Sequence, residues 1–277
     1  MKNIYFDNAA TAKLDDEVLK EMLPYLKDNY GNPSSIYKLG REARKAIEDS
    51  REKIAKVLNC KANEIYFTAG GSESDNTAIK GIAKANKKRG NHIITSKIEH
   101  PAVLETCKQL EKEGFEITYI SVDEKGIVDL EELKKSIKPT TILITIMFAN
   151  NEIGTIQPIE EIGKIAKGNN IYFHTDSVQA VGSIKIDVQK LNIDSLSLSG
   201  HKFYGPKGVG ALYVKTGVPF EKFISGGHQE RNKRPGTENV AGIVGIGKAI
   251  ELAYENLDEY NKKIKELSKG NSQKIQF

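Results

Sequence analysis

The chain has 277 residues, of which 39% are hydrophobic and 28% charged, and its formal net charge is +4 at pH 7. The apolar fraction is sufficient for a large buried core, which argues against global disorder. The near balance of charges disfavours nucleic acid as a partner. The two cysteines, Cys60 and Cys107, exclude a disulfide framework and a zinc site, so a reducing, cytoplasmic location is expected. We expect no secretory signal, and no apolar run approaches the roughly 20 residues of a membrane span.

Helical periodicity covers residues 15–29 and 36–58. From there, β-branched apolar runs alternate with amphipathic stretches. The apolar runs predict strands at 64–69, 92–96, 116–122, 141–149, 171–176, 193–199 and 210–215, and the stretches between them predict helices at 72–88, 101–113, 129–137 and 159–167. Strands that are apolar on both faces and separated by single helices indicate an α/β fold. We therefore predict a mostly parallel central sheet with helices on both faces.

A long helical pattern at 239–268 follows the last predicted strand and becomes steadily more charged. The residues after it, KGNSQKIQF, show no further strand or helix signal. We therefore expect an N-terminal arm at 1–14 and one large domain at 15–255. Residues 256–277 would begin a small C-terminal domain that is largely missing.

Lys202 lies in SGHKFYGPKG, directly after a predicted strand and before a Gly/Pro turn. Desolvation at a strand end lowers the pKa of a lysine and makes it a nucleophile that can form a Schiff base. Asp176 ends the strand IYFHTD, at the edge where open α/β sheets bind ligands, and could hold a pyridine nitrogen protonated. The alternative for Lys202 is an exposed loop lysine, and the alternative for Asp176 is a helix N-cap. His174 with Asp176 would lack a third metal ligand, so no metal site is predicted.

The segment TAGGSESDN, residues 68–76, follows a predicted strand and opens a helix. It presents free backbone N–H groups and the Ser72 hydroxyl at a positive helix end, which suits a phosphate. It lacks the GK[ST] sequence of a P-loop, which disfavours nucleotide triphosphate hydrolysis. The alternative is a flexible Gly-Gly helix entry capped by Ser72.

Three further polar positions are candidates with open alternatives. His100, placed at a strand end before Pro101, could stack on a cofactor ring or be a buried, satisfied histidine. Asn151, expected to close a strand in FANNEIG, could reach a ring substituent or build an Asx turn. His228 and Arg231 are interpreted as members of a polar loop.

Eight motifs carry a family resemblance: FDNAAT (6–11), GNPSS (31–35), TAGGSESDN (68–76), IEHP (98–101), NNEIG (150–154), HTD (174–176), SGHKFYGPKG (199–208) and RPGTEN (234–239). In this order and spacing they resemble the cysteine desulfurases, class V aminotransferase-type enzymes that use pyridoxal 5′-phosphate (PLP). The chain is most similar to the group that supplies sulfur for iron–sulfur cluster assembly. The resemblance implies the large domain of fold type I aminotransferases and a homodimer with shared active sites.

The resemblance also implies roles for single residues. Lys202 would hold PLP as a Schiff base, Asp176 would pair with the pyridine nitrogen, and His100 would stack on the ring and assist proton transfers. Asn151 and Gln179 would lie near the ring oxygen or the substrate carboxylate. The phosphate would be bound by Gly71, Ser72, Ser199 and His201, with Thr237 reaching the phosphate of the neighbouring subunit.

The family's catalytic cysteine and its substrate-binding arginine are expected well past RPGTEN, and neither is found before Phe277. Cys60 and Cys107 are interpreted as packing residues. We therefore predict a cysteine desulfurase that converts L-cysteine to L-alanine and passes sulfur to an enzyme thiol, for an iron–sulfur scaffold or other acceptor protein, with impaired turnover. The alternatives are a non-catalytic PLP-binding fragment, or another class V enzyme such as a selenocysteine lyase or a transaminase.

Overall fold

The computed structural model describes residues 4–272, with side chains described to residue 267. The longer helices are α1 (Asp16–Lys27), α2 (Lys38–Leu58), α3 (Gly71–Ala85), α4 (Pro101–Lys112), α5 (Leu130–Ser136), α6 (Ile159–Gly168), α8 (Val240–Glu255) and α9 (Leu257–Ser272). The short ones are α7 (Gln229–Asn232), η1 (Ala62–Glu64) and η2 (Gly200–Lys202). The strands are β1 (Ile65–Thr68), β2 (His92–Ser96), β3 (Glu116–Ile120), β4 (Thr141–Thr145), β5 (Tyr172–Asp176), β6 (Ser195–Ser199) and β7 (Gly210–Val214).

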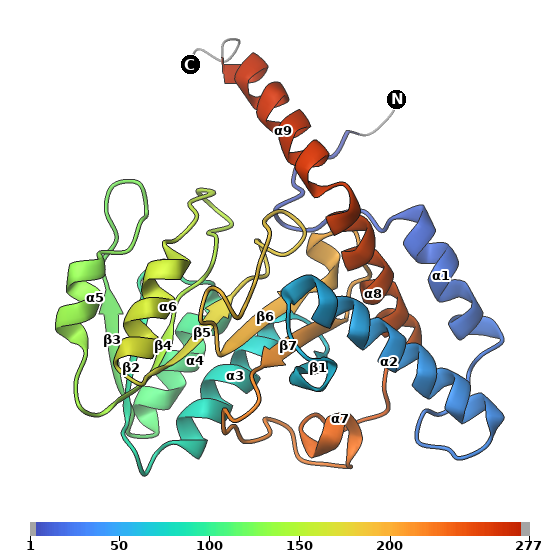
Figure 1. Ribbon diagram of the computed structural model, residues 1–277, viewed down its shortest axis with the longest axis horizontal. Coiled ribbons are helices and arrows are strands. Elements are labelled where there is room, and N and C mark those ends of the chain that lie inside the picture. The colour runs from blue at the N-terminus through green and yellow to red at the C-terminus, as the bar shows by residue number, and fades with distance from the viewer. Residues whose placement is uncertain (1–3, 273–277) are drawn as a thin grey trace.

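The strands form one sheet in the order β1-β7-β6-β5-β4-β2-β3 (Figure 1). Strand β7 is antiparallel to both of its neighbours, β1 and β6. The pairings from β6 through β5, β4 and β2 to β3 are parallel. The prediction of a mostly parallel sheet is confirmed, and the parallel strands place their carboxyl ends along one edge.

Helices cover both faces of the sheet, as predicted. In β7, Ala211 and Tyr213 belong to a core shared with α1, α2, α5, α6 and α8, whereas Leu212 and Val214 belong to a second core with α3 and α4. Because successive side chains of a strand point to opposite faces, the two cores lie on opposite sides of the sheet. This two-sided burial explains why the strands read as continuous apolar runs.

The strand predicted at 141–149 is shorter in the structure, because β4 ends at Thr145. The backbone N–H of Met147 donates to both carboxylate oxygens of Glu99, at 3.0 and 2.9 Å, which breaks the strand ladder. The N–H of Phe148 still donates to the carbonyl of Asp176 at 2.8 Å, so the segment continues alongside β5.

The prediction of a single helix at 239–268 is wrong. The segment forms two helices, α8 and α9, with a break at Asn256 (φ −120°, ψ 22°). The loop at 183–184 binds both sides of this break. Tyr254 Oη donates to the Ile184 carbonyl at 2.7 Å, and Asn261 Nδ2 donates to the Ser183 carbonyl at 2.9 Å. These contacts fix the angle at which α9 leaves the body of the protein (Figure 1).

Helix α9 extends to Ser272, so the first residues of KGNSQKIQF are helical, contrary to expectation. Residues 273–277 of that segment lie outside the described residues. Within residues 4–272, no helix combines the length and the apolar character needed to cross a membrane.

Candidate active site

A cavity of about 580 Å³ opens beside the carboxyl ends of β5 and β6. Every predicted cofactor residue except Thr237 lines it: Gly71, Ser72, His100, Asn151, Asp176, Gln179, Ser199, His201 and Lys202. The sequence reasoning placed these residues at strand ends and at a helix entry far apart in the chain. The sheet topology gathers them because the carboxyl ends of parallel strands share one edge.

Lys202 lies in the short helix η2, just beyond β6, and is half-buried. Burial lowers the pKa of its amine, and the charges of Asp176 and Asp7 partly oppose that shift. Its Nζ donates to the carbonyl oxygens of Ala9 and, at 2.9 Å, Ala10. The amine is therefore held at the cavity by the N-terminal segment and is not a free loop lysine.

Asp176 is the last residue of β5 and only 5% exposed. Burial raises the pKa of its carboxyl, and a hydrogen bond from the Val178 N–H at 2.9 Å opposes this, as do the charges of His100 and Lys202. The carboxylate thus caps the turn that follows β5 and also lines the cavity. In the described chain no helix lies between Asp176 and β6, so Asp176 caps a turn and not a helix, and its pairing with a ring nitrogen stays a prediction.

A second buried carboxyl, Asp75 of α3, lines the same cavity and was missed by the sequence reasoning. Its Oδ1 atom has no hydrogen-bond partner among the described residues. Burial and the neighbouring Asp176 raise its pKa well above the usual value. Its position could have been noticed, because it precedes Ala78, Ile79 and Ile82 on the apolar face of α3.

His174 does not supply a compensating positive charge to these carboxyls. Its Nε2 lies 3.7 Å from Asp75 Oδ1, and its ring nitrogens contact Ser197 Oγ at 3.0 Å and Thr145 Oγ1 at 2.8 Å. Burial lowers its pKa to about 3, so the imidazole is neutral. Among the described residues, the positive charges that act on Asp176 come from the half-buried Lys202 and the exposed His100, not from His174. Two buried carboxyls at the cavity also fit a protonated ring nitrogen of a ligand.

Gly71, Ser72, Ser199 and His201, the residues predicted to bind a phosphate, lie together on the cavity wall, and we call this group the anion cradle. Gly71 opens α3, and a Cβ there would lie 2.6 Å from Cγ2 of Val178, so this helix entry requires glycine. The first backbone N–H groups of a helix have no intrahelical acceptors and attract anions. The cradle also lines a second cavity, of about 560 Å³, together with Glu73 and Lys207.

His100 and Asn151 line the cavity from places that differ from those predicted. His100 is exposed, lies four residues past the end of β2, and caps α4 by accepting from the Ala102 N–H at 3.1 Å. Asn151 does not close a strand, because it lies in a turn beyond β4 and donates from Nδ2 to Glu152 Oε1 at 2.9 Å. Loops rather than strands present both side chains.

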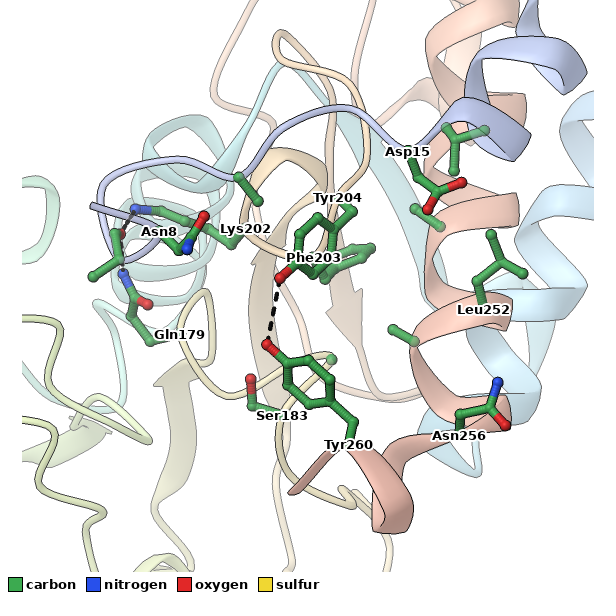
Figure 2. Close-up of a pocket in the computed structure, with 16 residues that line it drawn as sticks. Asn8, Asp15, Gln179, Ser183, Lys202, Phe203, Tyr204, Leu252, Asn256 and Tyr260 are labelled. Carbon is green, nitrogen blue, oxygen red and sulfur yellow. Dashed lines mark hydrogen bonds between the residues drawn. The ribbon is translucent and has the colours of Figure 1, made fainter. Parts of the chain in front are cut away.

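A third cavity, of about 350 Å³, lies on the other side of Lys202, between the N-terminal segment and helices α8 and α9 (Figure 2). It shares Ala9, Gln179 and Lys202 with the main cavity. Gln179 Nε2 donates to the same Ala9 carbonyl as Lys202, at 3.0 Å. The backbone at Ala9 therefore separates two spaces that both reach the lysine.

Several predicted residues lie elsewhere. Thr237 is exposed and lines a separate cavity of about 160 Å³. His228 immediately precedes α7, and Arg231 lies in this four-residue segment, where Glu230 and Arg231 have left-handed rather than helical dihedrals, in keeping with the interpretation of a polar loop.

The two cysteines are outside the cavities that contain Lys202. Cys60 follows the end of α2, and Cys107 is buried inside α4, where it belongs to the second core. Burial raises the pKa of both thiols to about 12. Both residues therefore have the character of packing residues rather than of reactive thiols.

The class V aminotransferase family model matches residues 4–276. The chain therefore belongs to the class V aminotransferases, enzymes whose cofactor is PLP. Two relatives are each 60% identical over 266 residues, 96% of this chain: the cysteine desulfurase IscS of Clostridium botulinum (strain Hall) and that of Methanosarcina thermophila. The chain spans 67% and 66% of their respective lengths.

Solved structures show the same relationship. A NifS-like protein superposes with a TM-score of 0.95 at 47% identity, covering 97% of this chain and 74% of that one. A structure described as SspA in complex with cysteine gives a TM-score of 0.87 at 44% identity, covering 95% of this chain and 78% of that one. A cysteine desulfurase from Thermococcus onnurineus NA1, in its apo form, gives a TM-score of 0.90 at 30% identity, covering 98% of this chain and 72% of that one.

The residues of the main cavity fit PLP on three independent grounds. Lys202, with its lowered pKa, can bind an aldehyde. The unpartnered Asp75 Oδ1 and the buried Asp176 fit a protonated ring. The glycine-dependent entry to α3 fits a phosphate.

Proposed function

We propose that this chain carries the PLP-dependent cysteine desulfurase site, at which L-cysteine is converted to L-alanine when a reactive thiol accepts the sulfur, and that turnover is impaired because neither Cys60 nor Cys107 is such a thiol. The single observation that carries the proposal is one cavity that joins Lys202, Asp176 and the anion cradle. The substrate is supported by the relatives named cysteine desulfurase and by the neighbouring structure described with cysteine.

PLP, when bound, supplies an electron sink for the electrons released at the substrate Cα. Lys202 Nζ binds the cofactor and is the base that takes the Cα proton, because its lowered pKa leaves more of the amine unprotonated. The Asp176 carboxylate holds the proton on the ring nitrogen. The anion cradle binds the phosphate and thereby fixes the ring against these two groups.

The other cavity residues orient the ring and move protons. His100, at the cavity rim, packs on the ring and carries protons between substrate and solvent. Asn151 and Gln179 contact the ring oxygen or the substrate carboxylate. To hold the cofactor, Lys202 Nζ would have to release the carbonyls of Ala9 and Ala10.

We further propose a homodimer in which Thr237 reaches the phosphate of the partner subunit's site. The proposal is supported by the exposure of Thr237 and by its distance from its own main cavity. An iron–sulfur scaffold or another protein thiol is the proposed sulfur acceptor, in the cytoplasm, where the free thiols of Cys60 and Cys107 persist.

The proposed domain division keeps residues 1–14 as an arm and 15–255 as the cofactor-binding domain. Residues 256 onward would begin a second unit. This boundary is supported by the break at Asn256 and by the exposure of Ile264 and Leu267 on α9.

The central experiment is borohydride reduction of the protein incubated with PLP, followed by peptide mapping. We expect the label on Lys202, loss of the label in Lys202→Ala, and normal labelling in Lys207→Ala, which removes a nearby lysine on the same loop. Label on Lys207, or no label in the parent chain, contradicts the assignment. An assay for alanine against a keto acid separates desulfurase from transaminase chemistry, and sedimentation velocity tests the dimer.

A further inference from the structure

The loop between α7 and α8 is tied to the anion cradle by an ion pair. Arg234 Nε lies 2.8 Å from Glu73 Oε1, and Arg234 Nη2 lies 3.2 Å from Glu73 Oε2. Glu73 directly follows Ser72 in the first turn of α3. Paired N–H···O contacts between a guanidinium and a carboxylate fix orientation as well as distance. The pair therefore sets the position of the loop relative to the helix entry.

Glu73 also holds the turn that leads into α3. Its Oε2 accepts from the Ala69 N–H at 3.0 Å, just beyond the end of β1. Glu73 lines the second cavity together with the anion cradle, whereas Arg234 lines the small cavity of Thr237. One carboxylate thus joins the turn, the cradle and the Thr237 loop.

A carboxylate beside a phosphate site is unfavourable unless its charge is neutralised. Arg234 faces three carboxylates, those of Glu73, Glu230 and Glu238. Glu230 is already matched by Arg51, at 2.7 and 2.8 Å, in a pair whose side chains are 2% and 3% exposed. Arg234 therefore serves mainly to neutralise Glu73, the acid next to the cradle.

The base of the loop is rigidly held, so the position of Arg234 is specified. Glu230, Arg231 and Asn232 have left-handed φ values of 45°, 55° and 64°. Such strain persists where surrounding contacts impose it. Here the contacts are the Arg51–Glu230 pair, the Glu230 bond from the Phe67 N–H at 2.9 Å, and the Arg231 bond to the Ile65 carbonyl.

We propose that Glu73 and Arg234 are positioning residues that set the affinity of the anion cradle for a phosphate group. Glu73 orders the turn into α3, and Arg234 cancels the negative charge that Glu73 brings to the site. This inference rests on the proposed function, because it concerns the phosphate of PLP.

The test compares the dissociation constants of PLP and of pyridoxal, which lacks the phosphate, for four variants. Arg234→Met exposes the Glu73 charge and should weaken PLP binding roughly tenfold while changing pyridoxal binding little. Glu73→Gln keeps an acceptor for Ala69 and should stay within about threefold of the parent chain. The double variant Arg234→Met/Glu73→Gln should recover most of the PLP preference. Lys84→Met, which breaks an ion pair with Glu113 at the far end of α3, is the matched control.

The outcomes separate the inference from the proposed function. A parent chain without preference for PLP over pyridoxal overturns the cradle itself and the inference with it. A parent chain that prefers PLP, combined with an unchanged preference in Arg234→Met or a double variant that is not rescued, overturns the inference alone. Arg234→Lys, which keeps the charge and loses the paired contact, should be intermediate, and it replaces Arg234→Met if thermal melting shows that the latter is unfolded.

Discussion

Asp176 combines burial with a charge that the proposed chemistry needs, so its replacement separates binding from proton chemistry. In Asp176→Asn we expect PLP to remain bound through the anion cradle, because the cradle residues are untouched. Proton exchange at the Cα of a bound amino acid should become slower, because the activation barrier rises by about 1.5–3 kcal/mol, the size of a charge-assisted contact. Deuterium incorporation measured by mass spectrometry is the readout. Asp187→Asn, which changes a half-buried carboxylate that is bonded to Asn59 and does not line the cavity, is the control. Equal exchange in Asp176→Asn and the parent chain would give Asp176 another role.

Glu99 predicts a pH dependence of stability. Burial and the charge of Asp176 raise its pKa to about 8, partly opposed by hydrogen bonds from Ser96 Oγ at 2.5 Å and the Met147 N–H. The folded state therefore binds this proton more tightly than the unfolded chain does. The stability it contributes is fully present below about pH 4.5 and is lost as the pH rises to about 8.

Glu99→Gln removes this titration and keeps the side-chain volume. Between about pH 5 and about pH 9, the free energy of unfolding of the parent chain should fall by about 2–4 kcal/mol relative to the variant. Urea denaturation at both pH values measures it. Glu124→Gln, at an exposed position, should show no such difference. Parallel pH curves for the parent chain and Glu99→Gln would show that Glu99 is ionised throughout.

The residues that sequence reasoning found are those whose position follows from the local pattern. Asp176 ends an apolar run, Lys202 closely follows another, and Ser72 lies in the first turn of a helix, so each could be assigned to the ligand-binding edge. Asp75 and Glu99 were missed because their importance comes from pairing with strands distant in sequence. Nothing local in IEHP indicates that Glu99 binds the backbone at Met147.

At the scale of elements, β7 approaches the entry to α3 closely enough to exclude a side chain. A Cβ on Gly210 would lie 2.6 Å from the Leu198 carbonyl oxygen and 2.7 Å from the Gly70 Cα. Gly210→Ala should therefore lower the free energy of unfolding by about 1–3 kcal/mol. It should also weaken PLP binding, because Gly70 adjoins the cradle.

Gly168→Ala is the control for this prediction, since a Cβ at the end of α6 would meet no atom within 4 Å. That variant should gain about 0.4–1 kcal/mol of stability without altering PLP affinity. Calorimetry and PLP titration check both variants. A Gly210→Ala protein as stable as the parent would mean that β7 can shift away from the helix entry.

The element boundaries show where sequence patterns stop being informative. Periodicity predicted the helices of the large domain to within a few residues, because each buries an apolar face in one of the two cores. It missed the break at Asn256, since the contacts of Tyr254 and Asn261 with residues 183–184 cause it. It overextended β4, since the Glu99 carboxylate captures the backbone N–H that would continue the ladder.

At the scale of the whole molecule, the chain holds two thiols, and neither suits sulfur transfer. Cys107 is fully buried, and the pKa of each thiol is raised to about 12, so thiolate is scarce at neutral pH. We expect the 277-residue chain, loaded with PLP and given L-cysteine, to exchange the Cα proton but to release essentially no sulfide and form no persulfide on its own cysteines. Sulfide and alanine assays with intact-mass measurement check this, and proton exchange is the positive control. Robust alanine production that disappears in Cys60→Ser or Cys107→Ser would contradict it.

The order of strands in the sheet also governs how the protein can be made. β1 is an edge strand whose neighbour is β7. The buried Arg51, which donates to the Ile65 carbonyl of β1, forms its ion pair with Glu230, a residue far later in the chain. A ribosome delivers residues 65–68 long before residues 210–230, so β1 and α2 emerge without their partners. Pairing between ends so distant in sequence is slow and leaves apolar strand edges exposed in the meantime. The sheet therefore closes last at the edge that is made first, because β1 has no strand partner until β7 has left the exit tunnel.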